Sequence, residues 1–362
     1  MNSINADNGK RFFKISLGML FYSLIVLVIC IIFRPFAEFY TRTVSNFCRV
    51  IVSYLFSVFP FSFSEIIIIL LPFIVLVLLI LIIAKRISFK HFILNLVGTF
   101  FVLFFLFVNI FGVCYFRKPL EVNMGFDMYT PSFDELVECA DFLKDKLEKS
   151  ADDIEFSSDY SSTNPYDWGS LCKLVDKGYD KLEDEHPFLT AINVNAKKIA
   201  LSSIMTYTHI SGIYMPFTSE ANVNTNYPDY VVAYSLAHEK AHQRGIAGED
   251  EANFVAFLAC VYSENEYLEY SALMSMYEYF LDEIYKSDPT AYYNMIESTD
   301  KRIVGEMYAY SVFFDKYRDS SASKVADTVN DTYIKAMGDS RGVESYSRVV
   351  ELCVSYFKEY SL

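Results

Sequence analysis

Residues 238–242 read His238-Glu239-Lys240-Ala241-His242. On a helix, positions four apart lie on one face about one turn apart, so the two imidazoles can reach a single metal ion. Zinc accepts neutral nitrogen ligands and, in a catalytic site, leaves its fourth position to water. Glu239 projects beside the histidines and is expected to take a proton from that water as a general base. The motif therefore predicts a zinc centre with hydrolytic chemistry.

The flanking residues predict that this motif lies on a helix over about 230–244. Asp229, which follows a proline, is expected to be the N-cap, and the residues from 231 to 236 are apolar. Gly245 is a natural C-terminal stop. The motif is therefore expected near the C-terminal end of this helix.

A third protein ligand is expected from the helix that begins at Glu249, because the connection 245–248 is short and returns the chain beside His242. Glu249 is the favoured ligand, and Glu251 is the alternative if the helical register differs. Asn253, four residues after Glu249, is expected to orient a ligating imidazole from the second shell of the site. The predicted cofactor is Zn²⁺, although affinity alone does not exclude cobalt or manganese.

The pattern His-Glu-x-x-His followed by Glu-x-x-Ala-Asn resembles the gluzincin peptidases, in which a glutamate on a following helix completes the zinc site. The spacer in this chain is unusually short for that group. A metzincin arrangement is excluded, because Gly248 stands where the third histidine of that group would lie.

More closely, the chain is similar to a bacterial family known as domain of unknown function 3810. The resemblance rests on three N-terminal spans and on four stretches, which are Pro216 to Asn224, His238 to Gly245, Glu249 to Phe254 and Gly342 to Val350. Ser219 stands where the family pattern has a glycine. The resemblance implies a peptidase-type, zincin-like fold, but it supplies no activity, since the family has none assigned.

Two further roles are implied by the gluzincin resemblance. Gluzincins bind the substrate backbone along an edge strand before the metal helix, and the candidates for that strand are Glu220, Ala221, Asn222, Val223 and Asn224. Such sites also need a donor that stabilises the oxyanion formed on the scissile carbonyl. Tyr346 and Arg348 are the candidates for this catalytic role.

Three stretches in the first third of the chain are long and apolar enough to cross a bilayer, at about 15–33, 66–84 and 92–116. The sequence therefore divides into a membrane region, residues 1–117, and a following domain, residues 118–362. Lysines and arginines lie before the first span and between the second and third, and they are expected to stay in the cytoplasm. Residues 34–65 and the C-terminal domain would then lie outside a multi-pass cytoplasmic membrane.

The C-terminal domain is predicted to be mainly helical with a small sheet, an α+β arrangement. Helices are expected near 132–147, 169–184, 192–207, 230–244, 249–286, 290–318, 321–337 and 342–360. Strand character is confined to 212–217 and 221–224. The many tyrosines after residue 260, Tyr279 among them, are expected to pack helix faces.

Charge and cysteine content exclude other classes of protein. The first 117 residues carry 10 basic and 3 acidic side chains, and the remainder carries 21 and 42. So acidic a domain is not suited to bind nucleic acid, which requires a basic patch. The seven cysteines include no C-x-x-C pair, which argues against a cysteine-built zinc site, and one or two disulfides remain open.

The sequence as a whole predicts a membrane-anchored zinc metallopeptidase that cleaves a protein or peptide substrate outside the cytoplasm. The alternative is a membrane receptor, sensor or scaffold that uses a zincin-like fold without catalysis. The spans contain almost no ionisable residues of the kind that line transport pathways, which argues against a transporter. Substrate and oligomeric state are not encoded in any pattern of the sequence.

Overall fold

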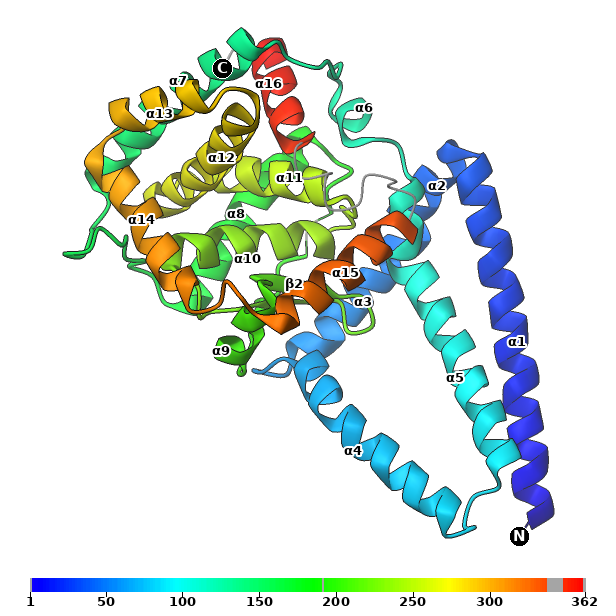
Figure 1. The fold of residues 1–362 in the computed structure, drawn as a ribbon. Helices are drawn as coiled ribbons and strands as arrows, with labels where there is room; N and C mark the ends of the chain where they lie inside the picture. The colour runs from blue at the N-terminus through cyan, green and yellow to red at the C-terminus, as the bar shows by residue number, and fades with distance from the viewer. Residues whose placement is uncertain (1, 191, 337–347, 361–362) are drawn as a thin grey trace. The chain divides into compact units, whose positions relative to one another are not determined.

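The computed structural model describes residues 2–190, 192–336 and 348–360, and the chain divides into two compact units (Figure 1). The first unit comprises Met1–Lys118 together with Met215–Glu220, and the second comprises Pro119–Tyr214 and Ala221–Leu362. The division near residue 118 coincides with the one drawn from the sequence. The short segment Met215–Glu220 was not expected in the first unit.

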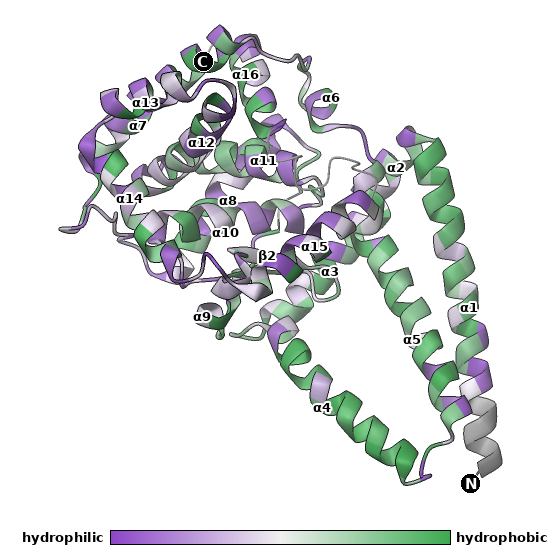
Figure 2. Cartoon of the chain, in the orientation of Figure 1, coloured by the Kyte–Doolittle hydropathy of each residue, from purple (hydrophilic) through white to green (hydrophobic). Residues whose placement is uncertain are grey.

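Three helices of the first unit are long and apolar enough to cross a membrane. They are Gly9–Ile32 within α1 (Asn2–Ile32), α4 (Phe63–Ile83) and α5 (Phe89–Ile110). Figure 2 shows that hydrophobic residues cover most of α4 and α5. The prediction of three apolar helices is confirmed, and α1 packs along α5.

The connection between the first two apolar helices is itself helical. It consists of α2 (Arg34–Tyr40), a π-helical turn (Thr41–Ser45) and α3 (Asn46–Ser57). Arg49 of α3 is almost completely buried and donates hydrogen bonds to Ser45 Oγ at 2.8 Å and to the carbonyl of Ile110 at 3.1 Å. These bonds tie the connection to the end of α5.

The segment Met215–Glu220 makes polar contacts with the other part of its own unit. The Glu220 carboxylate accepts the backbone N–H of Phe63 at 3.0 Å and that of Ser64 at 2.9 Å. A carboxylate is stabilising there, because the first N–H groups of a helix are unpaired and carry a partial positive charge. Ser219 accepts a further hydrogen bond from Ser53 at 3.0 Å. Glu220 thus helps to define where α4 begins.

The second unit is built from helices around one hydrophobic core. They are α6 (Leu120–Met124), α7 (Phe133–Ser150), α8 (Trp168–Glu185), α9 (Ser202–Met205), α10 (Asp229–Gln243), α11 (Glu249–Tyr262), α12 (Glu266–Ser287), α13 (Pro289–Ser298), α14 (Lys301–Asp315), α15 (Ser321–Ala336) and α16 (Arg348–Tyr360). Short 3₁₀ turns lie at Gly112–Phe116 in the first unit and at Ala151–Asp153 and Thr206–Thr208 in the second. Helix α12 packs against α7, α10 and α11, and this group of helices forms the centre of the core.

Several predicted helices have different limits in the structure. The expected helix over 192–207 is wrong: this segment holds the strand β1 (Lys197–Lys198) and the short helix α9. The expected helix over 249–286 is broken, because Glu264 has a φ of 53° and Asn265 then caps α12 by accepting the N–H of Leu268. Residues 342–347, which were predicted to be helical, lie outside the described residues.

The predicted small sheet is present, with three strands in the order β1-β3-β2. Strand β2 spans Gly212–Met215 and β3 spans Glu220–Val223, and β1 pairs in parallel with β3 through Lys197 opposite Asn222. Strand β3 is therefore the central strand and is buried along its length. The expectation that Glu220–Asn224 form an edge strand is wrong, because β1 arises from a segment that was predicted to be helical. Strands β1 and β2 are therefore the two edges of this sheet, and β2 is the one whose Gly212 lies against Glu239.

Helices α8 and α11 cross with almost no side chain between them. A Cβ atom added at Gly178 would lie 1.8 Å from the carbonyl oxygen of Ala259, which is far inside van der Waals contact. The glycine is therefore required by the close approach of the two backbones rather than by its own dihedral angles. This close crossing fixes the position of α11 relative to α8.

Candidate metal centre

Helix α10 carries the His-Glu-x-x-His motif in its last two turns. The helix begins at Asp229 directly after Pro228, and no side chain caps it. The expectation that Asp229 is the N-cap is wrong, because its carboxylate instead accepts the N–H of Asn164 at 2.9 Å. The predicted stop at Gly245 is confirmed by a φ of 88° in the left-handed region, which favours glycine.

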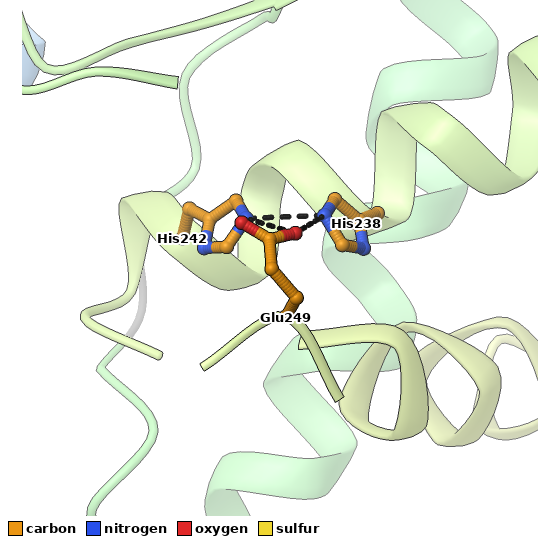
Figure 3. Close-up of side chains that lie close together, drawn as sticks. All are labelled: His238, His242 and Glu249. Atoms are coloured by element: carbon orange, nitrogen blue, oxygen red, sulfur yellow. Dashed lines mark hydrogen bonds and ion pairs between the residues drawn. The ribbon is translucent and has the colours of Figure 1, made fainter. Parts of the chain in front are cut away.

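The short connection after α10 brings the first residue of α11 back to the histidines (Figure 3). The Glu249 carboxylate oxygen lies 3.3 Å from Nε2 of His238 and 3.6 Å from Nε2 of His242. The two Nε2 atoms are 3.0 Å apart. These three side chains form the group of potential metal ligands among the described residues. The separations suit one small ion, since zinc binds imidazole nitrogen and carboxylate oxygen at about 2.0–2.2 Å.

Both imidazoles are oriented by hydrogen bonds at their other ring nitrogen. Nδ1 of His242 lies 2.7 Å from the carbonyl oxygen of Ile246, which can only accept, so Nδ1 carries the proton. Nδ1 of His238 lies 2.7 Å from the side-chain oxygen of Asn253. In the neutral form of each ring, Nε2 then has its lone pair directed at the shared point. Such outer hydrogen bonds fix the tautomer and ring orientation of metal-binding histidines.

The charged groups within this cluster shift one another's pKa. Burial opposes a charged His242, but the Glu249 carboxylate outweighs burial and raises the pKa of His242 to about 9. Burial would likewise raise the pKa of Glu249, but the two imidazoles hold it well below its usual range. The carboxylate is thus kept ionised, which is the state required of a metal ligand. The donor set of two imidazoles and one carboxylate fits zinc with one position left for water.

Glu239 lies between the metal helix and strand β2 and is almost completely buried. Burial raises the pKa of its carboxyl group to about 7, while His238 and His242 oppose the rise. A Cβ atom added at Gly212 would lie 2.5 Å from Oε1 of Glu239, so the side chain is packed tightly against β2. Its Oε2 atom accepts no hydrogen bond from the part of the chain that the structure describes. A buried carboxylate with an unused oxygen beside the ligand cluster is suited to hold and move a proton.

The face of α10 opposite the ligands is held by a buried ion cluster. Asp176 of α8 accepts hydrogen bonds from Lys240 at 2.7 Å and from Arg244 at 3.0 Å. Lys240 also donates to the carbonyl of Val194 at 2.8 Å, and the guanidinium of Arg244 lies 4.0 Å from the centre of the Tyr179 ring. Burial lowers the pKa of Lys240, and the Asp176 carboxylate opposes this effect. The cluster fixes the rotation of α10 and hence the direction of its histidines.

Other predicted site residues lie elsewhere. Glu220–Asn224 form the buried central strand and its end, where Asn222 donates to the carbonyl of Ile213 at 3.1 Å. Both terminal nitrogens of Arg348 are engaged by carboxylates, those of Asp250 and Glu121, at 3.0 Å each. The structure therefore does not support Arg348 as the oxyanion donor. Tyr346 lies outside the described residues.

Some residues near the cluster were not singled out in the sequence. The ring of Tyr214 on β2 lies 6.5 Å from the ring of His242. Tyr279 of α12 is half-buried, and its hydroxyl makes no hydrogen bond to any residue that the structure describes. Burial and then the charges of Glu249 and Glu278 raise the pKa of Tyr279, so the phenol stays protonated. Among many tyrosines, no local pattern distinguishes these two.

Comparison with known proteins gives one family. Residues 40–354 match the family described as Protein of unknown function (DUF3810). No curated protein and no solved structure matches the chain.

Proposed function

The chain belongs to the DUF3810 family, whose description assigns no function, and we propose that it is a membrane-anchored zinc metallopeptidase. The observation that carries the proposal is the convergence of His238, His242 and Glu249 on one point, with the unused oxygen of Glu239 beside them. A ligand set alone would fit a structural metal. The buried carboxylate next to it is the additional group that hydrolysis requires.

The expected chemistry follows from the residues of the chain. A bound zinc ion would polarise the scissile carbonyl and lower the pKa of a coordinated water. Glu239 accepts the proton of the attacking water, since its carboxylate lies beside the ligand cluster with an oxygen that no described residue uses. The same carboxyl group then returns the proton to the leaving amine. Both transfers use one buried side chain that β2 holds in place.

An edge strand beside the base provides a place for an extended peptide. Strand β2 is at the edge of the sheet, and its Gly212 contacts the Glu239 side chain. A peptide can add to such an edge through backbone hydrogen bonds, which orient the scissile bond without demanding a particular side chain.

The location of the proposed reaction follows from the charge of the loops. Lys10, Arg11 and Lys14 precede the first apolar helix, and Lys85, Arg86 and Lys90 lie between α4 and α5. Under the positive-inside rule both basic segments remain in the cytoplasm, which leaves the second unit outside. The substrate would then be an extracytoplasmic protein or peptide.

A non-catalytic receptor, sensor or scaffold with a zincin-like fold is the competing proposal. Such a protein needs no carboxylate at position 239, and burying one with an unpaired oxygen is unfavourable without a function for it. The buried Glu239 therefore favours the enzyme over the binding protein.

The test compares the full-length protein with its Glu239→Gln variant, both purified in detergent micelles. Metal content is measured by elemental analysis, and cleavage of a peptide library is followed by mass spectrometry. The proposal expects about one zinc per chain in both proteins and a loss of cleavage in the variant by about 10²–10⁴-fold, the usual contribution of a general base. Zinc in both without cleavage by either would support the receptor. Absence of metal from both would overturn the zinc site itself.

A further inference from the structure

The first turn of α11 is tied to the chain segment that leaves the membrane region. Two residues after Glu249, the Glu251 carboxylate accepts the backbone N–H of Leu120 at 2.8 Å. Leu120 opens α6, the first helix of the second unit. The helix turn that supplies the proposed metal ligand is thus in direct contact with the residues that follow the third apolar helix.

A partly buried arginine makes a second connection between the same segments. Arg348, the first residue of α16, donates to Asp250 through one terminal nitrogen and to Glu121 through the other, each at 3.0 Å. The Asp250 side chain is 3% exposed and the Glu121 side chain 13%, so water screens these ion pairs poorly. A guanidinium that holds two carboxylates in a fixed geometry gives orientation as well as attraction.

The dipole of α11 does not account for this arrangement. Acidic side chains in the first turn of a helix are stabilised by the helix itself, which explains why Glu249, Asp250 and Glu251 occur there. It does not explain a cation from α16 that bridges one of them to Glu121 on α6. The bridge places negative charge from two segments on one guanidinium, so its removal would take away the cation that these two carboxylates share.

We propose that Arg348, together with Leu120 and Glu121, positions the first turn of α11 so that Glu249 faces His238 and His242. Arg348 is in this view a positioning residue, and the affinity of the site for metal depends on the segment that follows the third apolar helix. The inference rests on the proposed metal site.

The test uses the full-length protein in detergent micelles with Zn²⁺ and Co²⁺ as probes. Zinc affinity is measured by competition with a chromogenic chelator, and the visible absorption of bound Co²⁺ reports the number and geometry of its ligands. Arg348→Met is expected to weaken zinc binding by about 10–100-fold, the range found for outer-shell partners of metal ligands, and to change the Co²⁺ spectrum. Arg348→Lys, which keeps the charge but not the two fixed donor nitrogens that bridge Asp250 and Glu121, is expected to retain part of the affinity.

Lys358→Met is the matched control, because Lys358 lies on the same helix and pairs with Glu135 of α7 at 3.1 Å, without any link to α11. It is expected to leave both readouts unchanged. If Arg348→Met does not fold, Glu121→Gln replaces it and is expected to shift both readouts in the same direction by a smaller amount.

The outcomes separate this inference from the function on which it rests. Wild-type zinc affinity and an unchanged Co²⁺ spectrum in the Arg348 and Glu121 variants would overturn the positioning role while leaving the metal site intact. A lower unfolding temperature with an unchanged spectrum would show a merely structural role and would also overturn the inference. Failure of the wild-type protein to bind either ion would overturn the proposed metal site and the inference with it.

Discussion

The side-chain oxygen of Asn253 lies 2.7 Å from Nδ1 of His238. Asn253 is on α11, one turn after Glu249, so a single helix provides both a proposed ligand and the residue that orients another ligand. The distance between these two functions along the helix is fixed by helical geometry. The site therefore depends on the register of α11 against α10, because a shift of α11 would move Glu249 and Asn253 together.

Replacing Asn253 tests this dependence. Asn253→Ala removes the acceptor for His238 Nδ1, and metal affinity is expected to fall by about 10–100-fold because the imidazole loses its fixed tautomer and orientation. Asn253→Asp keeps an oxygen acceptor and is expected to retain most of the affinity. Competition with a chromogenic chelator measures both variants. Wild-type affinity in Asn253→Ala would show that the hydrogen bond does not orient a metal ligand.

Gly212→Ala tests the packing of the base without touching a ligand. The added Cβ would lie 2.5 Å from Oε1 of Glu239, so the carboxylate must move from its position. Zinc content is expected to stay at the wild-type level, while peptide cleavage is expected to fall by about 10²-fold, since misplacement by about 1 Å can have an effect of this size. Ile213→Ala, at an exposed neighbouring position on β2, is the control. Equal cleavage by Gly212→Ala and the wild type would show that the reaction does not depend on the position of the Glu239 carboxylate.

Asp176→Ala tests the buried ion cluster behind the metal helix. The change leaves Lys240 and Arg244 buried without their counter-ion, which is expected to lower the free energy of unfolding by about 3–5 kcal/mol. Glu264→Gln removes an exposed partner of Lys177 and Lys181 and should have no measurable effect. Denaturant unfolding followed by tryptophan fluorescence measures the difference. Similar stability for both variants would mean that the cluster does not hold α10.

Glu278 predicts a dependence of stability on pH. Burial raises the pKa of Glu278 from 4.5 to about 7, with Tyr230 opposing the rise and Glu306 adding to it. At pH values between 4.5 and 7, Glu278 keeps its proton in the folded protein but has lost it in the unfolded chain. The contribution of Glu278 to stability is therefore present below pH 4.5 and is lost as the pH rises through 7.

The neutral variant Glu278→Gln should therefore match the wild type near pH 4.5 and exceed its stability by about 1–3 kcal/mol at pH 8. Thermal unfolding across this pH range measures the difference in stability between the variant and the wild type. Glu283→Gln, on the same helix and paired with Lys286, should show no such widening. A gap that stays constant with pH would show that the carboxyl group of Glu278 titrates normally.

The clustering of His238, His242 and Glu249 could be predicted from the sequence because its determinants are local. The spacing of His238 and His242 is that of a helix turn, and the short connection to Glu249 leaves the chain few ways to return. The apolar helices were predictable for a similar reason, since length and hydrophobicity alone decide whether a helix can span a bilayer. Asn253 followed from the position of Glu249 on the same helix.

The remaining features depend on contacts between distant parts of the chain. Strand β1 was mistaken for helix, because Lys197–Lys198 become a strand only by pairing with β3. That error led to the wrong prediction that β3 is an edge strand, whereas β2 is the edge strand next to Glu239. The partners of Arg348 lie more than 90 positions away, on α6 and α11, so no local pattern separates an ion-pairing arginine from a catalytic one.

The contact between Gly178 and Ala259 has a consequence for the evolution of the protein. Because the two backbones touch, every other amino acid at position 178 would force α8 and α11 apart, whatever its polarity. Asp176 lies on the same helix two residues earlier, and the helix that supplies Glu249 is the one displaced. Random mutagenesis scored by folding or metal binding should thus find position 178 intolerant of even alanine, while exposed positions on the same helix accept most substitutions.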